Sequence, residues 1–281
     1  MSVAPGLSYR LPCMADIRQP VVFMPHGGGP WPFVDLGMPK DELEALAGYL
    51  RRVAQVPPGR PRALLVVSAD WEEVVPTVMT AAQPPMLYDY YGFPPEAYTV
   101  TWPAPGAPDV AVRVREVVQQ AGFQAGIDAT RGFDHGTFVP LSLTYPQADI
   151  PTLQLSLIRG LNPVTHLALG RALRPLRDEG VFIIGSGLSF HNLRAFFGGG
   201  AAREAAQFDA WLQESMQQDP ATREARLVQW ADAPSARICH PREEHLMPLL
   251  VAAGAAGDDP CTLAYADTLG GHRNSAFHFG V

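Results

Sequence analysis

The histidines of this sequence are the residues whose positions are most consistent with metal binding or acid–base catalysis. Neutral imidazole is the commonest metal ligand and is also suited to acid–base work near pH 7. The chain has eight histidines. His166 lies inside an amphipathic helical pattern, and we assign it to the surface or the core. Five others stand in loops or at the ends of predicted elements, beside Gly, Asp, Asn or Glu: His26, His135, His191, His240 and His245.

The stretch around His26 is typical of a strand that opens into a loop. The apolar run Val21–Met24 ends at Pro25, and three glycines follow His26. An apolar run bounded by Gly and Pro predicts a buried strand, and ligands of open α/β sheets bind at the carboxyl ends of strands. A sharp turn that carries a histidine would give the same pattern, so this stretch alone does not indicate a function. Because several other histidines also stand at the ends of predicted elements, we favour a metal- or histidine-dependent enzyme.

The string from His26 to Gly29 also resembles the oxyanion-hole loop of esterases. Such an enzyme needs a serine in the spacing G-x-S-x-G, and Ser186, between Gly185 and Gly187, lacks it. The serine-hydrolase hypothesis is therefore disfavoured. No H-E-x-x-H motif and no paired cysteines are present, so no single spacing is a strong metal signature.

Apolar runs alternate with helical patterns along the chain. The spacing predicts an amphipathic helix over Asp41–Val53 and another over Asp109–Ala121. Further helices are expected from Pro163 to Gly180, around Ala205–Met216, and over Glu243–Ala253 with His245 in the first turn. Strands are expected at Val21–Met24, Ala63–Val67, Val74–Thr80, Thr152–Leu157 and Val181–Ile184. This alternation predicts a single α/β domain, with a central mostly parallel or mixed sheet and helices on both faces.

Two stretches are predicted as loops near the chemistry. Residues 84–108 are rich in Pro, Tyr and Gly, and Asp134-His135-Gly136 is a shorter polar loop. Long ordered loops often form lids or pocket walls. We expect aromatic side chains of the first loop to wall a pocket for a planar ring, although packing of the loop itself explains them equally well: Tyr88, Tyr90, Tyr91 and Phe93.

Composition excludes several classes of protein. The chain has 281 residues, 47% of them hydrophobic, and a net charge of −7 with scattered basic residues. We therefore expect neither nucleic acid nor a membrane surface as partner, and no apolar run approaches the ~20 residues of a membrane span. The N-terminus lacks an apolar signal core, which predicts a cytoplasmic protein. The cysteines, predicted to be reduced, are Cys13, Cys239 and Cys261.

Several blocks of the sequence, taken together and in order, resemble the class III extradiol ring-cleavage dioxygenases, in the branch that includes 4,5-DOPA dioxygenase. The resemblance implies a catalytic domain over residues 15–281 behind an N-terminal extension, residues 1–14. The oligomeric state, monomer or homodimer, stays open. The blocks are His26-Gly27-Gly28, Val66–Ala69 before Asp70-Trp71, Gly92–Pro95 with Pro103–Gly106, Gly132–Gly136, Gly185–Gly187 with His191–Arg194, and Glu244-His245 with Pro248–Leu250.

The resemblance implies a mononuclear metal, expected to be Fe(II) with Zn(II) possible, and a catechol-type aromatic substrate that is opened with O2. The implied ligands are His26, the position of Asp70, and His245. His191 is implied next to the metal, as a fourth ligand or as the acid–base group. His135 is implied as a second catalytic acid–base or substrate-contacting residue.

One position departs from the family pattern. The family reads Ser-Ala-His-Trp, whereas this chain reads Ser68-Ala69-Asp70-Trp71. Two imidazoles and one carboxylate still form a ligand set known from non-heme Fe(II) oxygenases, although aspartate is shorter than histidine. The alternative hypothesis is a family member with a degraded metal site that binds a small molecule without catalysis.

Overall fold

A mixed sheet of eight strands forms the centre of the computed structural model, which describes residues 18–281. The expected N-terminal extension and Cys13 lie outside the described residues. The strand order is β4-β3-β5-β2-β6-β1-β8-β7. The strands are β1 (Val21–Pro25), β2 (Ala63–Glu73), β3 (Thr77–Met79), β4 (Gly126–Asp128), β5 (Thr152–Ile158), β6 (Val181–Gly187), β7 (Cys261–Leu269) and β8 (His272–Phe279). The predicted single α/β domain with a mixed sheet is confirmed.

The four central strands, β5, β2, β6 and β1, run parallel. Their apolar runs are buried on both faces, as expected for parallel strands covered on two sides. Met24 of β1 pairs with Ser186 of β6, and Ser68 of β2 pairs with the same serine. The carboxyl ends of these three strands therefore meet at one edge of the sheet.

The strands β8 and β7 extend the sheet antiparallel beyond β1, and the sequence analysis did not anticipate them. Gly270 and Gly271 connect them with φ values of 59° and 76°. Two consecutive residues with positive φ suit a tight hairpin turn, which explains the Gly-Gly pair. The chain thus ends on an edge hairpin that flanks the strand leading to His26.

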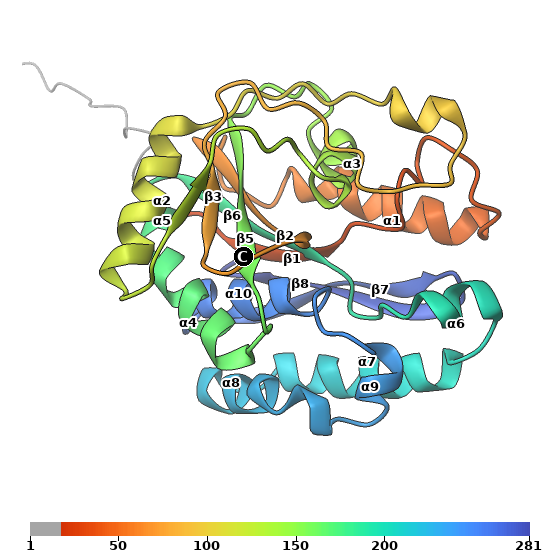
Figure 1. The fold of residues 1–281 in the computed structure, drawn as a ribbon. Coiled ribbons are helices and arrows are strands. Elements are labelled where there is room, and N and C mark those ends of the chain that lie inside the picture. The colour runs from red at the N-terminus through yellow and green to blue at the C-terminus, as the bar shows by residue number, and fades with distance from the viewer. Residues whose placement is uncertain (1–17) are drawn as a thin grey trace, which may run out of the picture.

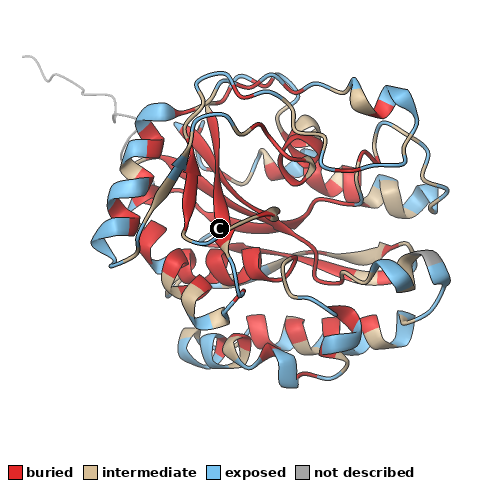
Figure 2. Cartoon of the chain, in the orientation of Figure 1, coloured by how far each residue is buried: buried red, intermediate tan, exposed pale blue. Residues whose placement is uncertain are grey.

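Helices cover both faces of the sheet, as predicted: α1 and α3 lie on one face and α4, α7 and α10 on the other (Figure 1). Figure 2 shows the strands buried between these layers, with the outer helix surfaces exposed. No helix within residues 18–281 is long and apolar enough to cross a membrane. The helices are α1 (Lys40–Val53), α2 (Pro108–Gln120), α3 (His135–Thr144), α4 (Pro163–Leu173), α5 (Pro175–Asp178), α6 (Leu193–Gly198), α7 (Ala202–Met216), α8 (Pro220–Val228), α9 (Ala236–Cys239) and α10 (Met247–Ala256), with short 3-10 helices η1 (Pro95–Tyr98) and η2 (Trp230–Asp232).

Three boundaries differ from the predictions for local reasons. α10 begins at Met247 rather than Glu243, which leaves His245 in the preceding turn; Pro248 then occupies the first helical turn, where its missing N–H breaks no hydrogen bond. Asp134 and His135 do not lie in an open loop, because His135 is the first residue of α3. The helix predicted up to Gly180 divides before Pro175, which cannot continue the hydrogen-bond ladder of α4.

Candidate metal centre

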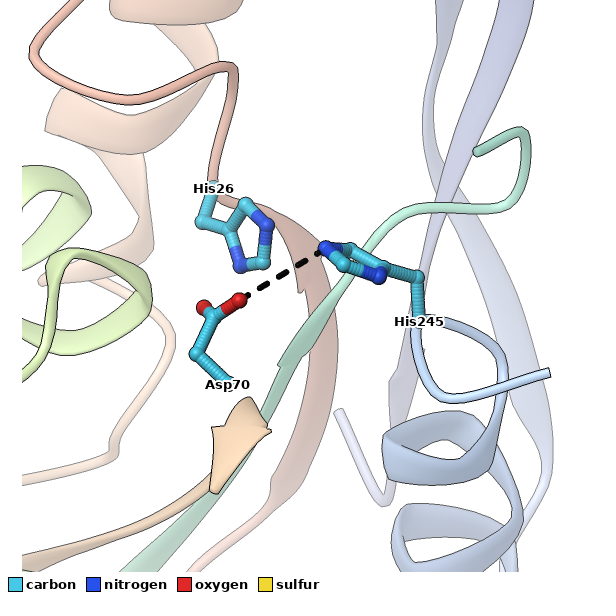
Figure 3. Close-up of side chains that lie close together, drawn as sticks. All are labelled: His26, Asp70 and His245. Carbon is cyan, nitrogen blue, oxygen red and sulfur yellow. Dashed lines mark ion pairs between the residues drawn. The ribbon is translucent and has the colours of Figure 1, made fainter. Parts of the chain in front are cut away.

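His26 and Asp70 reach the same point from neighbouring parts of the sheet. His26 follows the last residue of β1 and is fully buried. The pairing of β2 with β5 shifts register between Val67 and Glu72, and Asp70 lies in this irregularity, inside β2 rather than beyond its end. Such an irregularity redirects a side chain that regular alternation would place elsewhere. A ligand atom from each of His26, Asp70 and His245 lies within 4.8 Å of the others (Figure 3).

His245 and His191 are held side by side by one carboxylate. The two rings stack with their centroids 3.4 Å apart, and Oε1 of Glu244 lies 3.1 Å from Nδ1 of His191 and 3.0 Å from Nδ1 of His245. Burial raises the pKa of Glu244, but the hydrogen bonds from both imidazoles outweigh burial and hold that pKa well below its usual range. The charged carboxylate therefore favours a proton on each Nδ1 and leaves each Nε2 free.

His26 is positioned by Ser186 of β6. The hydroxyl of Ser186 donates to the carbonyl of Gly136, so its oxygen accepts from Nδ1 of His26 at 3.1 Å. Nε2 of His26 is then a buried acceptor with no hydrogen-bond partner among the described residues. Buried polar atoms in native proteins are almost always satisfied, so this atom indicates a missing partner. A metal ion is the partner that a neutral imidazole nitrogen suits best.

His135 has a different electrostatic environment. Oδ1 of Asp89, in the 84–108 loop, accepts from the backbone N–H of His135 at 3.1 Å and from its Nδ1 at 2.9 Å. Oδ2 of Asp70 lies 3.7 Å from the same ring nitrogen. Burial lowers the pKa of His135, but the carboxylates of Asp70 and Asp89 outweigh burial and raise it to about 9. We expect this imidazole to be a cation at neutral pH.

The residues present fit a divalent cation. Burial, aided by repulsion from neighbouring imidazoles, lowers the pKa of His26 and lowers that of His245 to about 3, so both rings are neutral and ready to coordinate. Without a cation, burial raises the pKa of Asp70 to about 7. An ion between Asp70 and the imidazoles would favour its charged form. Oδ1 of Asp70 lies 3.8 Å from Nε2 of His245, a separation that one ion can bridge.

A buried network that the sequence analysis missed supports Asp70. Ser68 donates to Asp134 at 2.9 Å and lies 3.4 Å from Oδ2 of Asp70. Asp134 also accepts from Arg131 at 2.9 Å and from Gln154 at 2.6 Å, so its buried charge is satisfied. A Cβ at Gly136 would come within 2.5 Å of Oδ2 of Asp70, which explains the glycine. No spacing in the sequence indicates these contacts, because they join three separate elements.

The remaining candidates lie apart from this centre or on its rim. His240 is buried elsewhere, with Nε2 2.9 Å from the carbonyl of Ser189. Of the aromatic residues in the 84–108 loop, Tyr90 packs edge-on against His135 with ring centroids 6.0 Å apart. Tyr91 is 91% exposed and forms no wall of an enclosed pocket in this structure. Glu244 and Asp89 are orienting residues that the sequence analysis gave no role, although Glu244 stands next to His245.

Residues 20–277 match the family described as the catalytic LigB subunit of aromatic ring-opening dioxygenase. The chain is 37% identical over 279 residues to the dioxygenase tasH of Hapsidospora irregularis. This alignment covers 93% of this chain and 85% of that protein. It is 42% identical over 203 residues to a 4,5-DOPA dioxygenase extradiol of Beta vulgaris, covering 71% and 75% of the two chains. A crystal structure of an uncharacterized protein from Escherichia coli K12 superposes with a TM-score of 0.76 at 29% identity, covering 94% of this chain and 100% of that one.

Proposed function

The chain belongs to the family of the catalytic LigB subunit of aromatic ring-opening dioxygenase, and from this premise we propose that it is a metal-dependent extradiol dioxygenase that opens a catechol-type ring with O2. One observation carries the proposal. In His26, His135, His191 and His245, Nδ1 is held by a serine or a carboxylate, while Nε2 has no hydrogen bond among the described residues. Tying one nitrogen to present the other is how proteins orient metal-binding and proton-transferring imidazoles.

In this proposal His26, Asp70 and His245 hold the cation. When bound, Fe(II) supplies Lewis acidity toward the two catechol hydroxyls and redox chemistry toward O2. Glu244 orients His245 through Nδ1, and Ser186 orients His26 in the same way. Two neutral imidazoles and one carboxylate leave coordination positions open for substrate, as a catalytic site requires.

His191 and His135 divide the proton chemistry. Glu244 fixes Nδ1 of His191, so its Nε2 is the atom that accepts a proton from a catechol hydroxyl and later returns it. His135, cationic between Asp70 and Asp89, donates toward negative charge that develops on the substrate oxygen. Tyr90 packs against His135 and limits the movement of its ring.

Anaerobic loading with Fe(II), followed by O2 uptake with a panel of catechols, tests the proposal. We expect one equivalent of iron per chain and a yellow ring-opened product from at least one catechol. A chain that loads iron and opens none of the rings would overturn the assigned activity.

The competing function is a family member that binds a small aromatic molecule without catalysis, and Asp70 in place of the usual histidine is the observation that favours it. Metal-free protein after loading, combined with saturable catechol binding, would establish that function instead. Oδ1 of Asp70 lies 3.8 Å from Nε2 of His245, a separation that one metal ion can bridge, and this distance favours the enzyme.

A further inference from the structure

Asp70 points toward His245 from a part of β2 that has left the regular pairing of the sheet (Figure 3). The register of β2 with β5 shifts between Val67 and Glu72, and the pairing of β2 with β6 ends at Ser68. Asp70 therefore lies outside both registers. Because buried backbone groups need partners, other groups must bond the N–H and the carbonyl of this residue and fix its position.

Two side chains bond the backbone of Asp70. Its N–H donates to Oγ of Ser68 at 3.2 Å, and its carbonyl accepts from Nη2 of Arg131 at 3.4 Å. Ser68 and Arg131 also donate to the carboxylate of Asp134, each at 2.9 Å. Asp134 is fully buried, so it links the two side chains that hold the backbone of Asp70.

Arg131 is itself fixed in place. Its Cζ lies 4.3 Å from the centroid of the ring of Trp71, the residue that follows Asp70. Its backbone N–H donates at 2.9 Å to Oδ1 of Asp128, the last residue of β4. The side chain is only 14% exposed, so water screens these contacts little. Arg131 thus contacts both the backbone of Asp70 and the neighbouring tryptophan from an anchored segment.

We infer that Arg131 is a positioning residue, which holds Asp70 at the metal centre. The inference rests on the proposed function and deepens it. Aspartate is shorter than the histidine usual in the family, so its reach toward the metal depends more strongly on where its backbone lies. A guanidinium group lies flat on an aromatic ring while its N–H groups donate in the plane, which the ammonium group of lysine does not reproduce.

A double-mutant cycle in Zn(II) affinity tests this role without relying on turnover. Competition titrations of metal-free protein compare the parent, Arg131→Met, Asp70→Ala and the double variant. Methionine keeps an aliphatic chain over Trp71 but removes the donors. The matched control is Arg159→Gln, since Arg159 is an exposed arginine that pairs with Glu73, also in β2, at 3.9 Å. Thermal unfolding without metal checks that every variant is folded.

We expect Arg131→Met to weaken Zn(II) binding about tenfold, as for other outer partners of a metal ligand. In the Asp70→Ala background the same substitution should change the affinity by less than about twofold, because Arg131 acts through Asp70. Arg131→Lys keeps a charge beside Asp134 and should lose about threefold. Arg159→Gln should match the parent. The visible spectrum of Co(II) bound to Arg131→Met should resemble that of Asp70→Ala.

Equal weakening by Arg131→Met in both backgrounds would overturn the inference, because Arg131 would then support the fold rather than Asp70. Unchanged affinity in Arg131→Met or in Asp70→Ala would also overturn it. If Arg131→Met does not fold, Arg131→Lys replaces it in the cycle and the same outcomes decide.

Failure of the proposed function gives a different result. A parent that binds Zn(II) but opens no catechol after loading with Fe(II) overturns the assigned activity, and the cycle still decides the role of Arg131. A parent that binds neither metal overturns both the metal centre and the inference.

Discussion

The histidines of the chain divide into two groups that differ in what surrounds their ring nitrogens. In the convergent group, Nδ1 is tied to a serine or carboxylate, Nε2 has no hydrogen bond among the described residues, and each ring centroid lies within 5.3 Å of another in the group: His26, His135, His191 and His245. In the dispersed group, a ring nitrogen is hydrogen-bonded to backbone or to a tyrosine in separate surroundings: His166, His240, His272 and His278.

Burial does not distinguish the two groups. His26 and His240 are both fully buried, and burial lowers the pKa of each. Each also has one ring nitrogen without a hydrogen bond among the described residues, Nε2 in His26 and Nδ1 in His240. They differ in what surrounds the ring: His26 lies beside the imidazoles of His135 and His245, whereas His240 lies beside Phe208 and Trp230. A buried histidine therefore indicates function only when a nitrogen is presented, unsatisfied, toward other groups of the same kind.

The largest expected effect separates His191 from the dispersed group. His191→Ala removes the proposed proton acceptor, so turnover should fall about 10²–10⁴-fold while most of the iron is retained. The control His272→Gln alters a dispersed histidine whose Nε2 meets the carbonyl of Gly200, and it should leave turnover and iron content near the parent values. Steady-state O2 uptake and iron analysis provide both measurements. Unchanged turnover in His191→Ala would remove His191 from catalysis, whereas loss of iron would make it a ligand.

Asp70 joins the convergent group without being a histidine, and two substitutions define what it does. Asp70→Ala should weaken Fe(II) or Zn(II) binding by more than about tenfold, because even an outer partner of a ligand contributes that much. Asp70→His restores the residue usual in the family, and it should raise affinity and ring opening above the parent only if Asp70 is a lesion in an old site. Equal affinities in metal titrations of all three proteins would place Asp70 outside the coordination sphere.

The sequence was informative about the core of the fold and about His26. The apolar runs Val21–Met24 and Val181–Ile184 predict buried strands because both faces of a parallel strand need apolar side chains. The hairpin β7–β8 was missed because neither strand is an apolar run: β7 is mostly half-exposed, and the buried strand β8 carries several polar residues. Its Gly270-Gly271 pair was the available turn signal.

The candidate site could be predicted only in part, because its contacts join distant segments. The resemblance to a family brought His26, Asp70 and His245 together, and spacing alone left them unrelated. The role of Glu244 depends on the stacking of His191 on His245, and the role of Asp89 depends on the position of its loop beside α3. Such contacts follow from packing, for which one sequence carries no local signal.

A smaller effect is expected from the carboxylate that orients two members of the convergent group. Glu244→Gln removes the negative charge that favours a proton on Nδ1 of His191 and His245, and it should lower metal affinity or turnover about 10–100-fold. The matched control is Glu243→Gln, since Glu243 is adjacent but pairs with exposed Arg237. Metal titration and O2 uptake on both variants test this. Equal behaviour of the two variants would contradict an orienting role for Glu244.

The smallest effect should come from the dispersed group, and it concerns stability rather than metal binding. Burial lowers the pKa of His278 from 6.5 to about 4, and Nε2 lies 2.9 Å from the hydroxyl of Tyr49. Between these two pH values the unfolded chain binds the proton and the folded chain does not, so this contribution to stability is present above pH 6.5 and is lost as pH falls toward 4.

His278→Phe should lower stability by about 1 kcal/mol at pH 7 through the lost hydrogen bond. It should also reduce the loss of unfolding free energy between pH 7 and pH 5 by about 2 kcal/mol. Urea unfolding of metal-free parent and variant at both pH values isolates His278, because the imidazoles of the convergent group titrate equally in the two proteins. If the unfolding free energy of the parent and of His278→Phe falls by the same amount between pH 7 and pH 5, His278 is not held neutral by burial. The contrast between the convergent and dispersed groups would then not hold for His278.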